Sequence, residues 1–508
     1  MRTRRPQPGR GLGGRLDAAL GAGTPQQRAA LALTHGVARG GALLAVHLRN
    51  FEDWRSPEGE VFNSGARDRG VLARFDHVLA GGLLSASWQG DFGRDVERPR
   101  DNSRTVRFHY PEEDSRRLNL SWERGTPGSL SRLGVTAFAG RHSLVTDQDR
   151  YATATTPRNV ERAEVSASDF HLRGYAHKPA GAARLEAGLD LNARADLHAV
   201  EVRLGYAASG EEAARSDLVA VEDARRVDTG AYASVDAPVG RGVSLAGGLR
   251  GDRVTSRNRG GHFGRHEADL VAVSGFASAT LGPLRGVSTT IQLARGFRDP
   301  FLSDRYYRGP SGRGFITGSP DLEAETSVQL DLAVRYASGA FRSAAYAYDY
   351  RIHGLIERYE TVADSFLFRN RGRARVRGLE AEAQVALPAR LSLELAAHVI
   401  RGVALDDGAA LDAIPPPTLT ARVRRDFGRA AGWVRLGAFG RLGEPGPTER
   451  ERAGYALLDG GVDLRLGSRL ELRLLGRNLL DKAYRVGPDS RAVYAPGLTG
   501  VATMTLRF

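Results

Sequence analysis

Polar and apolar residues alternate along much of this chain. In 328–336 every second residue is apolar or aromatic, and Asp331 and Arg335 lie on the opposite face. A period of two predicts half-buried strands, because successive side chains of a strand point to opposite faces. Many such segments run to ten residues or more, whereas strands of soluble proteins average about five to six.

Two further segments repeat the pattern. In 344–352 we assign the tyrosines to the apolar face and Arg351 to the polar face. In 379–387 aliphatic residues alternate with Glu380 and Glu382. One apolar and one charged face on strands of about 9–11 residues is the pattern of a transmembrane barrel, with lipid outside and a polar lumen inside. We therefore predict an all-β, antiparallel transmembrane β-barrel of about 22 strands, and we expect 10–508 to form it.

The predicted connections alternate between short turns and long loops. The long loops cover 53–66, 96–114, 146–161, 198–225, 300–321, 404–417 and 485–497. Outer-membrane barrels have short periplasmic turns and long extracellular loops. If the first strand starts in the periplasm, every long loop falls outside the cell.

Composition narrows the choice of class. No run approaches the roughly 18 apolar residues that mark a membrane helix, and the chain has no cysteine for disulfides or thiolate metal sites. The net charge is +13, almost all of it from arginine spread evenly along the chain, without a nucleic-acid recognition motif. We find no motif of a zinc hydrolase, a serine hydrolase or a phosphate-binding loop, and expect neither an enzyme nor a nucleic-acid-binding protein.

Four ordered motifs carry a resemblance to a family. They are "GFRDP" followed by "GSPDLEAETS", then "NRGRARVRGLEAEA", "LLGRNLLDKAYR" and the closing strand "APGLTGVATMTLRF". Together they resemble the barrel signatures of TonB-dependent receptors. Ser319 and Ala324 stand where that family usually has Asn and Pro.

The resemblance implies uptake of a scarce ligand across the outer membrane, most simply a ferric siderophore, with cobalamin or haem as alternatives. It implies as partners the lipid bilayer, the outer-membrane assembly machinery, a metal-chelate ligand, and the TonB complex acting through a plug domain; it implies no cofactor. Phe508, the terminal aromatic residue, would be the assembly signal. Residues 1–9 resemble the junction between plug and barrel, so the sequence is expected to be the barrel alone, and a passive plugless barrel is the rival interpretation.

Candidate contacts fall into two groups. In the long loop 300–321, arginine pairs well with anionic chelates and tyrosine offers flat amphipathic surface. We therefore expect ligand contacts from Arg305, Tyr306, Tyr307, Arg308 and Arg313. On the polar strand faces we expect lumen residues that pack against a plug, namely Asp331, Arg335, Arg351, Glu380 and Glu382. Each of these residues taken singly also fits ordinary lumen or loop polarity.

Overall fold

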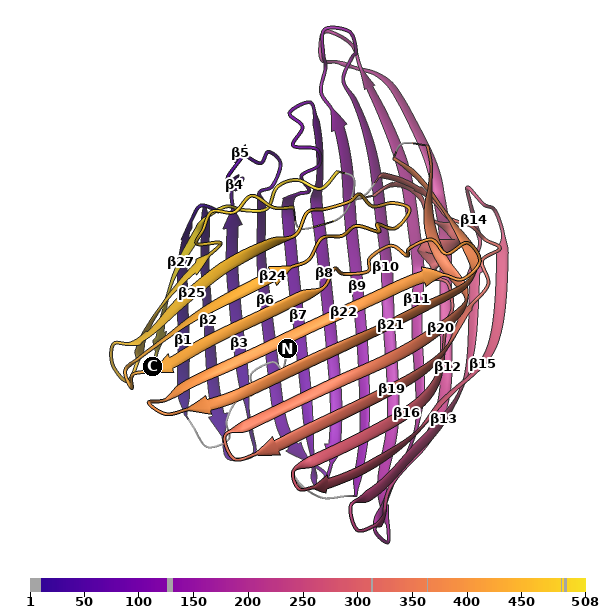
Figure 1. The fold of residues 1–508 in the computed structure, drawn as a ribbon. Helices are drawn as coiled ribbons and strands as arrows, with labels where there is room; N and C mark the ends of the chain where they lie inside the picture. The colour runs from indigo at the N-terminus through magenta and orange to yellow at the C-terminus, as the bar shows by residue number, and fades with distance from the viewer. Residues whose placement is uncertain (1–10, 126–130, 312–313, 363, 486, 488–490) are drawn as a thin grey trace.

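The computed structural model describes residues 11–125, 131–311, 314–362, 364–485, 487 and 491–508, and shows a closed antiparallel barrel of 22 strands (Figure 1). The prediction of fold class and strand number is confirmed. The expected plug junction, residues 1–9, lies outside the described residues. No helix among those residues has the length and apolarity to cross a membrane.

Each barrel strand pairs with its neighbours in chain order. The strands are β1 (Leu12–Ala22), β2 (Gln26–Val37), β3 (Gly40–Phe51), β6 (Ala66–Leu79), β7 (Gly82–Glu97), β8 (Val106–Arg124), β9 (Arg132–Arg150), β10 (Asn159–Ala180), β11 (Ala183–Tyr206), β12 (Glu212–Gly240), β13 (Val243–Asn258), β15 (His266–Leu284), β16 (Val287–Arg298), β19 (Glu325–Ser338), β20 (Phe341–Val362), β21 (Ser365–Leu387), β22 (Leu391–Ala404), β23 (Thr418–Asp426), β24 (Ala430–Phe439), β25 (Tyr455–Arg465), β26 (Leu470–Arg477) and β27 (Thr499–Arg507). The barrel closes where β27 pairs with β1, from Arg15 opposite Arg507 to Ala22 opposite Gly500.

Short elements lie in the connections. They are the hairpin β4 (Arg55–Ser56) and β5 (Gly59–Glu60), the strand β14 (Gly260–Gly261), the helix α1 (Leu302–Tyr306) and the strands β17 (Arg308–Ser311) and β18 (Gly314–Thr317). The long connections gather at one end of the barrel and the short turns at the other, which are the top and bottom of Figure 1. At the short-turn end Ala80–Gly81 and Arg285–Gly286 have positive φ at both positions, the geometry of tight turns that match the twist of a hairpin.

The two faces of the wall follow from the register, because residues paired across antiparallel strands point to the same side. Leu330 pairs with Leu293, and both are exposed on the outer wall. Leu379 pairs with Val399, and both are again exposed. The apolar faces predicted for 328–336 and 379–387 therefore form the outer wall.

The structure corrects the prediction of which side of 344–352 faces the lumen. Asp331 pairs with Tyr348, whereas Val328, exposed on the outer wall, pairs with Arg351. The prediction that Arg351 faces the lumen is therefore wrong, and Tyr346, Tyr348 and Tyr350 face the lumen instead. The hydroxyl of Tyr350 donates to Asp331 at 2.8 Å, so these aromatic residues act as polar lumen residues. Alternation fixes the period of a strand, but a tyrosine suits either face.

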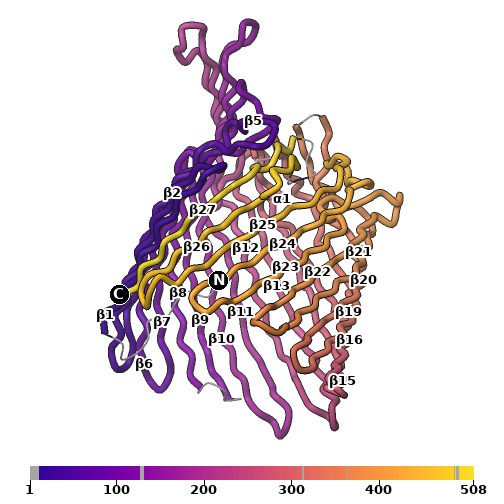
Figure 2. The backbone as a smooth tube through the Cα atoms, turned by 60° about the vertical axis from the view of Figure 1, so that its left-hand side comes forward, coloured from indigo at the N-terminus to yellow at the C-terminus, as the bar shows by residue number. Residues whose placement is uncertain are grey.

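Three predicted loops are strand over half of their length or more. The segments 96–114, 146–161 and 198–225 contain the upper ends of β7 to β12, and a connection of only 207–211 joins β11 to β12. A tilted strand needs only about 9–11 residues to cross a bilayer, so these hairpins continue well beyond it. Figure 2 shows them rising above the neighbouring strands.

Candidate functional site

The connection between β16 and β19 folds back toward the barrel wall. Leu302 and Tyr306 of α1 are buried in an apolar cluster with alanine, leucine and valine side chains of β10, β11 and β12. The strand β18 pairs in parallel with the start of β21, from Phe315 opposite Ser365 to Thr317 opposite Leu367. The loop 299–324 therefore links two separate parts of the wall across the mouth.

Two predicted ligand contacts are buried inside this loop. Tyr306 is 1% exposed and Arg305 is 6% exposed. The Arg305 guanidinium donates to the Pro320 carbonyl at 2.8 Å and to Asp299 at 3.5 Å. Asp299 also accepts from Arg226 of β12 at 3.0 Å. Burial contradicts direct ligand contact for Arg305 and Tyr306, and both side chains hold the loop in place.

The next two predicted contacts are also engaged within the protein. The Tyr307 hydroxyl donates to the Pro310 carbonyl at 2.6 Å, and burial raises the pKa of Tyr307 above its ordinary value. Arg308 forms an ion pair with Glu201 of β11 and lies 4.9 Å from the ring centre of Phe315. These contacts anchor β17, and ligand contact by either residue stays a prediction. Arg313 lies outside the described residues.

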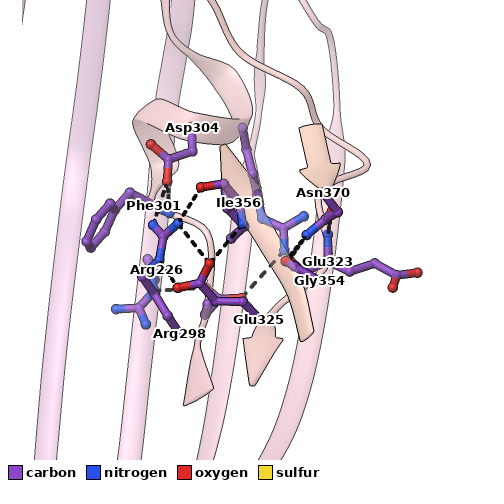
Figure 3. A network of polar contacts seen from close by, with 11 residues as sticks. Arg226, Arg298, Phe301, Asp304, Glu323, Glu325, Gly354, Ile356 and Asn370 are labelled. Carbon is purple, nitrogen blue, oxygen red and sulfur yellow. Dashed lines mark hydrogen bonds and ion pairs between the residues drawn. The ribbon is translucent and has the colours of Figure 1, made fainter. Parts of the chain in front are cut away.

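A polar network holds both ends of the loop (Figure 3). Arg298, at the end of β16, donates to Glu325 at 2.9 Å and to Asp304 at 3.2 Å. Glu325, at the start of β19, accepts from the Ile356 backbone N–H at 2.8 Å. Asp304 accepts from the backbone N–H of Phe301 at 3.1 Å. Burial raises the pKa of Asp304, and the Phe301 N–H and the Arg298 guanidinium oppose this shift.

The asparagine residues of two motifs have a similar role, which the sequence analysis missed. Asn370 accepts from the Glu323 N–H at 2.8 Å and donates to the carbonyls of Glu323 at 2.9 Å and Gly354 at 2.8 Å. Asn478 is 3% exposed and bonds the backbone of Lys482 through both its amide oxygen and its nitrogen. The signal in the sequence that could have indicated this role is that both asparagines lie inside the motifs that carry the family resemblance. We call these two residues and Glu325 the loop clamps.

Loops from distant strands meet at Asp364. Its carboxylate pairs with Arg100, from the β7–β8 connection, at 2.8 Å, and with Arg491, from the β26–β27 connection. The Asp364 carbonyl accepts from the Phe315 N–H of β18 at 2.7 Å. Asp364 therefore joins four segments over the mouth.

Four predicted lumen residues lie on the lumen face of β19 and β21. Asp331 accepts from Tyr350, and Glu382 accepts from the Tyr346 hydroxyl at 3.2 Å. The Arg335 guanidinium lies 5.5 Å from the ring centre of Tyr346, and Glu380 is paired with Tyr346 in the register. Contact with a plug remains a prediction for each of them.

A cavity of about 1190 Å³ runs along the lumen face of β23–β27 and β2, touches the ends of β3 and β6, and reaches the loop after β26. Its arginines are Arg28, Arg422, Arg424, Arg435, Arg473 and Arg477. Its acids are Asp459 and Asp463, so six positive charges less two negative charges leave a net charge of +4. Its aromatic residues are Phe51, Trp54, Trp433 and Tyr484.

The acids of the cavity balance only part of this charge. Asp463 is shared between Arg473 at 2.6 Å and Arg424 at 3.4 Å, and Asp459 pairs with Arg435 at 2.9 Å. Within the described residues, neither Arg28 nor Arg477 forms an ion pair. Cationic groups facing a polar cavity attract anions. The sequence analysis missed this set, because its members are far apart in the chain and only the barrel register brings them together.

Comparison with known proteins identifies the family. The description "TonB dependent receptor-like, beta-barrel" matches residues 53–479. The chain belongs to this family, whose fold is that of outer-membrane receptors and transporters. No curated protein sequence matches the chain.

Solved structures of the same architecture are similar to the barrel. The copper transporter OprC superposes with a TM-score of 0.84 at 15% identity, covering 99% of this chain and 81% of that one. The FrpB iron transporter from Neisseria meningitidis gives 0.74 at 15% identity, with coverages of 98% and 82%. The Serratia marcescens hemophore receptor HasR, in complex with its hemophore HasA and heme, gives 0.74 at 15% identity, with coverages of 99% and 82%. At this identity the likeness shows the fold alone.

Proposed function

We propose that this chain is the barrel of a receptor for TonB-dependent uptake of an anionic ferric siderophore. The cavity beside β23–β27 is the observation that carries the proposal, because its lining has a net charge of +4 and includes four aromatic side chains. Arginine forks pair with carboxylate and catecholate oxygens, and aromatic rings offer flat contact. A bare metal cation would be repelled by the same lining.

Ligand binding to the full-length chain in detergent tests this proposal. The probes are a ferric tricatecholate, which carries several negative charges, and a neutral ferric hydroxamate, and quenching of tryptophan fluorescence reports binding near Trp54 and Trp433. We expect the anionic chelate to bind more tightly, and Arg477→Gln to weaken it roughly tenfold, as loss of one charge-assisted contact predicts. Arg194→Gln, at a lumen arginine paired with Asp169 at 2.7 Å, is the matched control. Equal affinity for both chelates would overturn the proposal.

Haem is the second candidate, and one observation favours it. Phe439, Tyr455 and Tyr484 stack in sequence at 4.7 and 4.6 Å, which provides a flat aromatic surface beside the cavity. Haem adds a planar ring to its carboxylates, so it fits both features. In the same titration Tyr484→Ala should weaken haem by a larger factor than it weakens a tricatecholate, because a porphyrin covers more of the stacked rings than a catechol ring does.

We also propose roles for the remaining sequence-based candidates. A barrel of this diameter encloses a lumen that must be filled or plugged, and Asp331, Arg335, Glu380 and Glu382 would contact a plug domain through which TonB acts. Cross-linking in cells from a photoreactive residue placed at position 382 tests that contact. The absence of a cross-link to a plug domain would contradict it. Phe508 is proposed as the assembly signal. It lies at the short-turn end, where its backbone pairs with Gly14, and Phe508→Ala should leave less folded barrel in the outer membrane.

A further inference from the structure

The outward face of the β2–β10 sector changes from apolar to cationic toward the long-loop end. The register defines rows of outward side chains running across the strands. One row contains Leu33, Leu44, Ala73, Trp88, Leu118, Ala139 and Phe170. The next three rows toward the long loops contain Arg116 and Arg141, then Arg69, then Arg67 and Arg94. These five residues lie close together over three successive rows, and we call them collectively the arginine row.

The arginine row carries more charge than its surroundings neutralise. The acids on the same rows are Glu112, Asp114 and Glu164, so five positive charges less three negative charges leave a net charge of +2. Asp114 pairs with Arg94. The other four arginines are exposed, and none of them forms an ion pair within the part of the chain that the structure describes.

The register places like charges directly opposite each other. Arg67 is paired with Arg94 across β6 and β7, and Arg116 is paired with Arg141 across β8 and β9. Like charges at directly opposed positions destabilise a sheet. An anion between the two guanidinium groups of a pair would reverse the sign of that interaction, because both groups can then donate to it.

A groove adjoins the row on the outer wall. It has a volume of about 770 Å³, and its lining includes Leu20, Ala29, Leu48 and Phe92 together with Arg67, Arg69 and Arg94. Leu20 and Leu48 are 67% and 62% exposed. The groove therefore joins an apolar floor to a cationic rim, at the level where the apolar band ends.

We propose that this groove and the arginine row bind a phosphate-bearing lipid of the outer leaflet. The apolar band below the row is covered by acyl chains in a membrane, so a lipid is already the neighbour of these residues. Acyl chain contacts the floor of the groove, and phosphate oxygens lie between Arg67 and Arg94 and between Arg116 and Arg141. Arginine suits this role because its fork matches phosphate oxygens.

Native mass spectrometry of the full-length chain in detergent tests the proposal. The probe is a diphosphorylated glycolipid, compared with the same glycolipid after removal of both phosphates and with inorganic phosphate alone. We expect the diphosphorylated form to bind. The double variant Arg116→Gln, Arg141→Gln should weaken this binding by roughly tenfold or more, because two of the positive charges that attract the lipid phosphates are lost. The double Arg→Lys variant keeps the charge and should retain most of the binding.

Arg253→Gln is the matched control, because Arg253 is an outward arginine of β13 that already pairs with Asp269 at 2.8 Å. Mobility on unheated gels checks that every variant is folded. Equal binding of the dephosphorylated glycolipid, or equal loss in the Arg253 variant, would overturn the proposal. Displacement of the glycolipid by inorganic phosphate at similar concentration would also overturn it, since it would indicate a bare anion site and not a lipid site.

Discussion

At the scale of single residues, the loop clamps show how one side chain fixes the path of a long connection. Asn370 bonds three backbone groups from two other segments, and Glu325 holds both Arg298 and a backbone N–H. An amide can donate and accept at once, so it can bond the backbone N–H and C=O groups at strand ends, which have no partner in the sheet. The clamps therefore fix the path of the chain where it leaves the barrel wall.

Replacement of Asn370 by Ala removes three hydrogen bonds and leaves the Glu323 N–H without its acceptor. At about 1 kcal/mol for each bond, we expect the local opening free energy of the loop 299–324 to fall by roughly 2–3 kcal/mol. Hydrogen exchange on this loop measures the change. Asn102→Ala, in a different loop, is the control, and an unchanged exchange rate at 299–324 would contradict a clamping role.

Asp304 predicts a pH dependence for the same loop. Its folded pKa is raised above the ordinary 3.8 by burial, so the folded loop binds the proton more tightly than the open loop does. Its contribution to loop stability is therefore fully present below about pH 3.8 and is lost as the pH rises through the folded pKa. Hydrogen exchange corrected for intrinsic rates should show this loss, and Asp304→Asn should abolish it. A loop that becomes more stable as pH rises would contradict the sign.

Sequence reasoning reached the motifs but not their roles. The order "GFRDP" to "PDLEAETS" marks the two ends of one loop, and both ends lie where the pattern predicts. Burial of Arg305 depends on Asp299 and on the Pro320 carbonyl, contacts that no periodicity reveals. Arginine and tyrosine in a long loop are therefore ambiguous between ligand contact and loop anchoring, and here the anchoring contacts are present.

At the scale of elements, the inward fold of 299–324 depends on a small apolar cluster. Tyr306 packs against Ala199, Ala220 and Val221 on the wall. Strands of this length were predictable from alternation, and their upper ends were not, because charged residues above the bilayer hide the period. The hairpin of β11 and β12 provides the surface on which Tyr306 is buried. Because the upper ends of these strands were not predicted, the packing of the loop against them was not predicted either.

Removal of the Tyr306 side chain tests this element. Tyr306→Ala empties a fully buried site, a change that costs about 3–5 kcal/mol for large aromatic residues. We expect the loop to leave the wall while the barrel stays folded, with rapid proteolysis at Arg305 or Arg308 as the readout. Tyr151→Ala, at an exposed tyrosine, is the control. Unchanged proteolysis would contradict the anchoring role.

At the scale of the whole molecule, barrel closure brings β1 and β2 beside β23–β27. This juxtaposition creates the arginine-lined cavity, since Arg28 and Arg477 come from nearly opposite ends of the chain. The family and fold were predictable because long alternating strands and ordered motifs are local signals. The cavity was not, because its residues are gathered by closure and register.

Uptake by intact cells tests the central claim most directly. Cells that produce the full-length protein are given a radiolabelled anionic ferric siderophore, with and without a functional TonB system. The account predicts accumulation that requires TonB and falls roughly tenfold with Arg477→Gln, in line with loss of one charge-assisted contact. Accumulation that is independent of TonB and equal for neutral solutes of the same size would contradict it, and would identify a passive barrel.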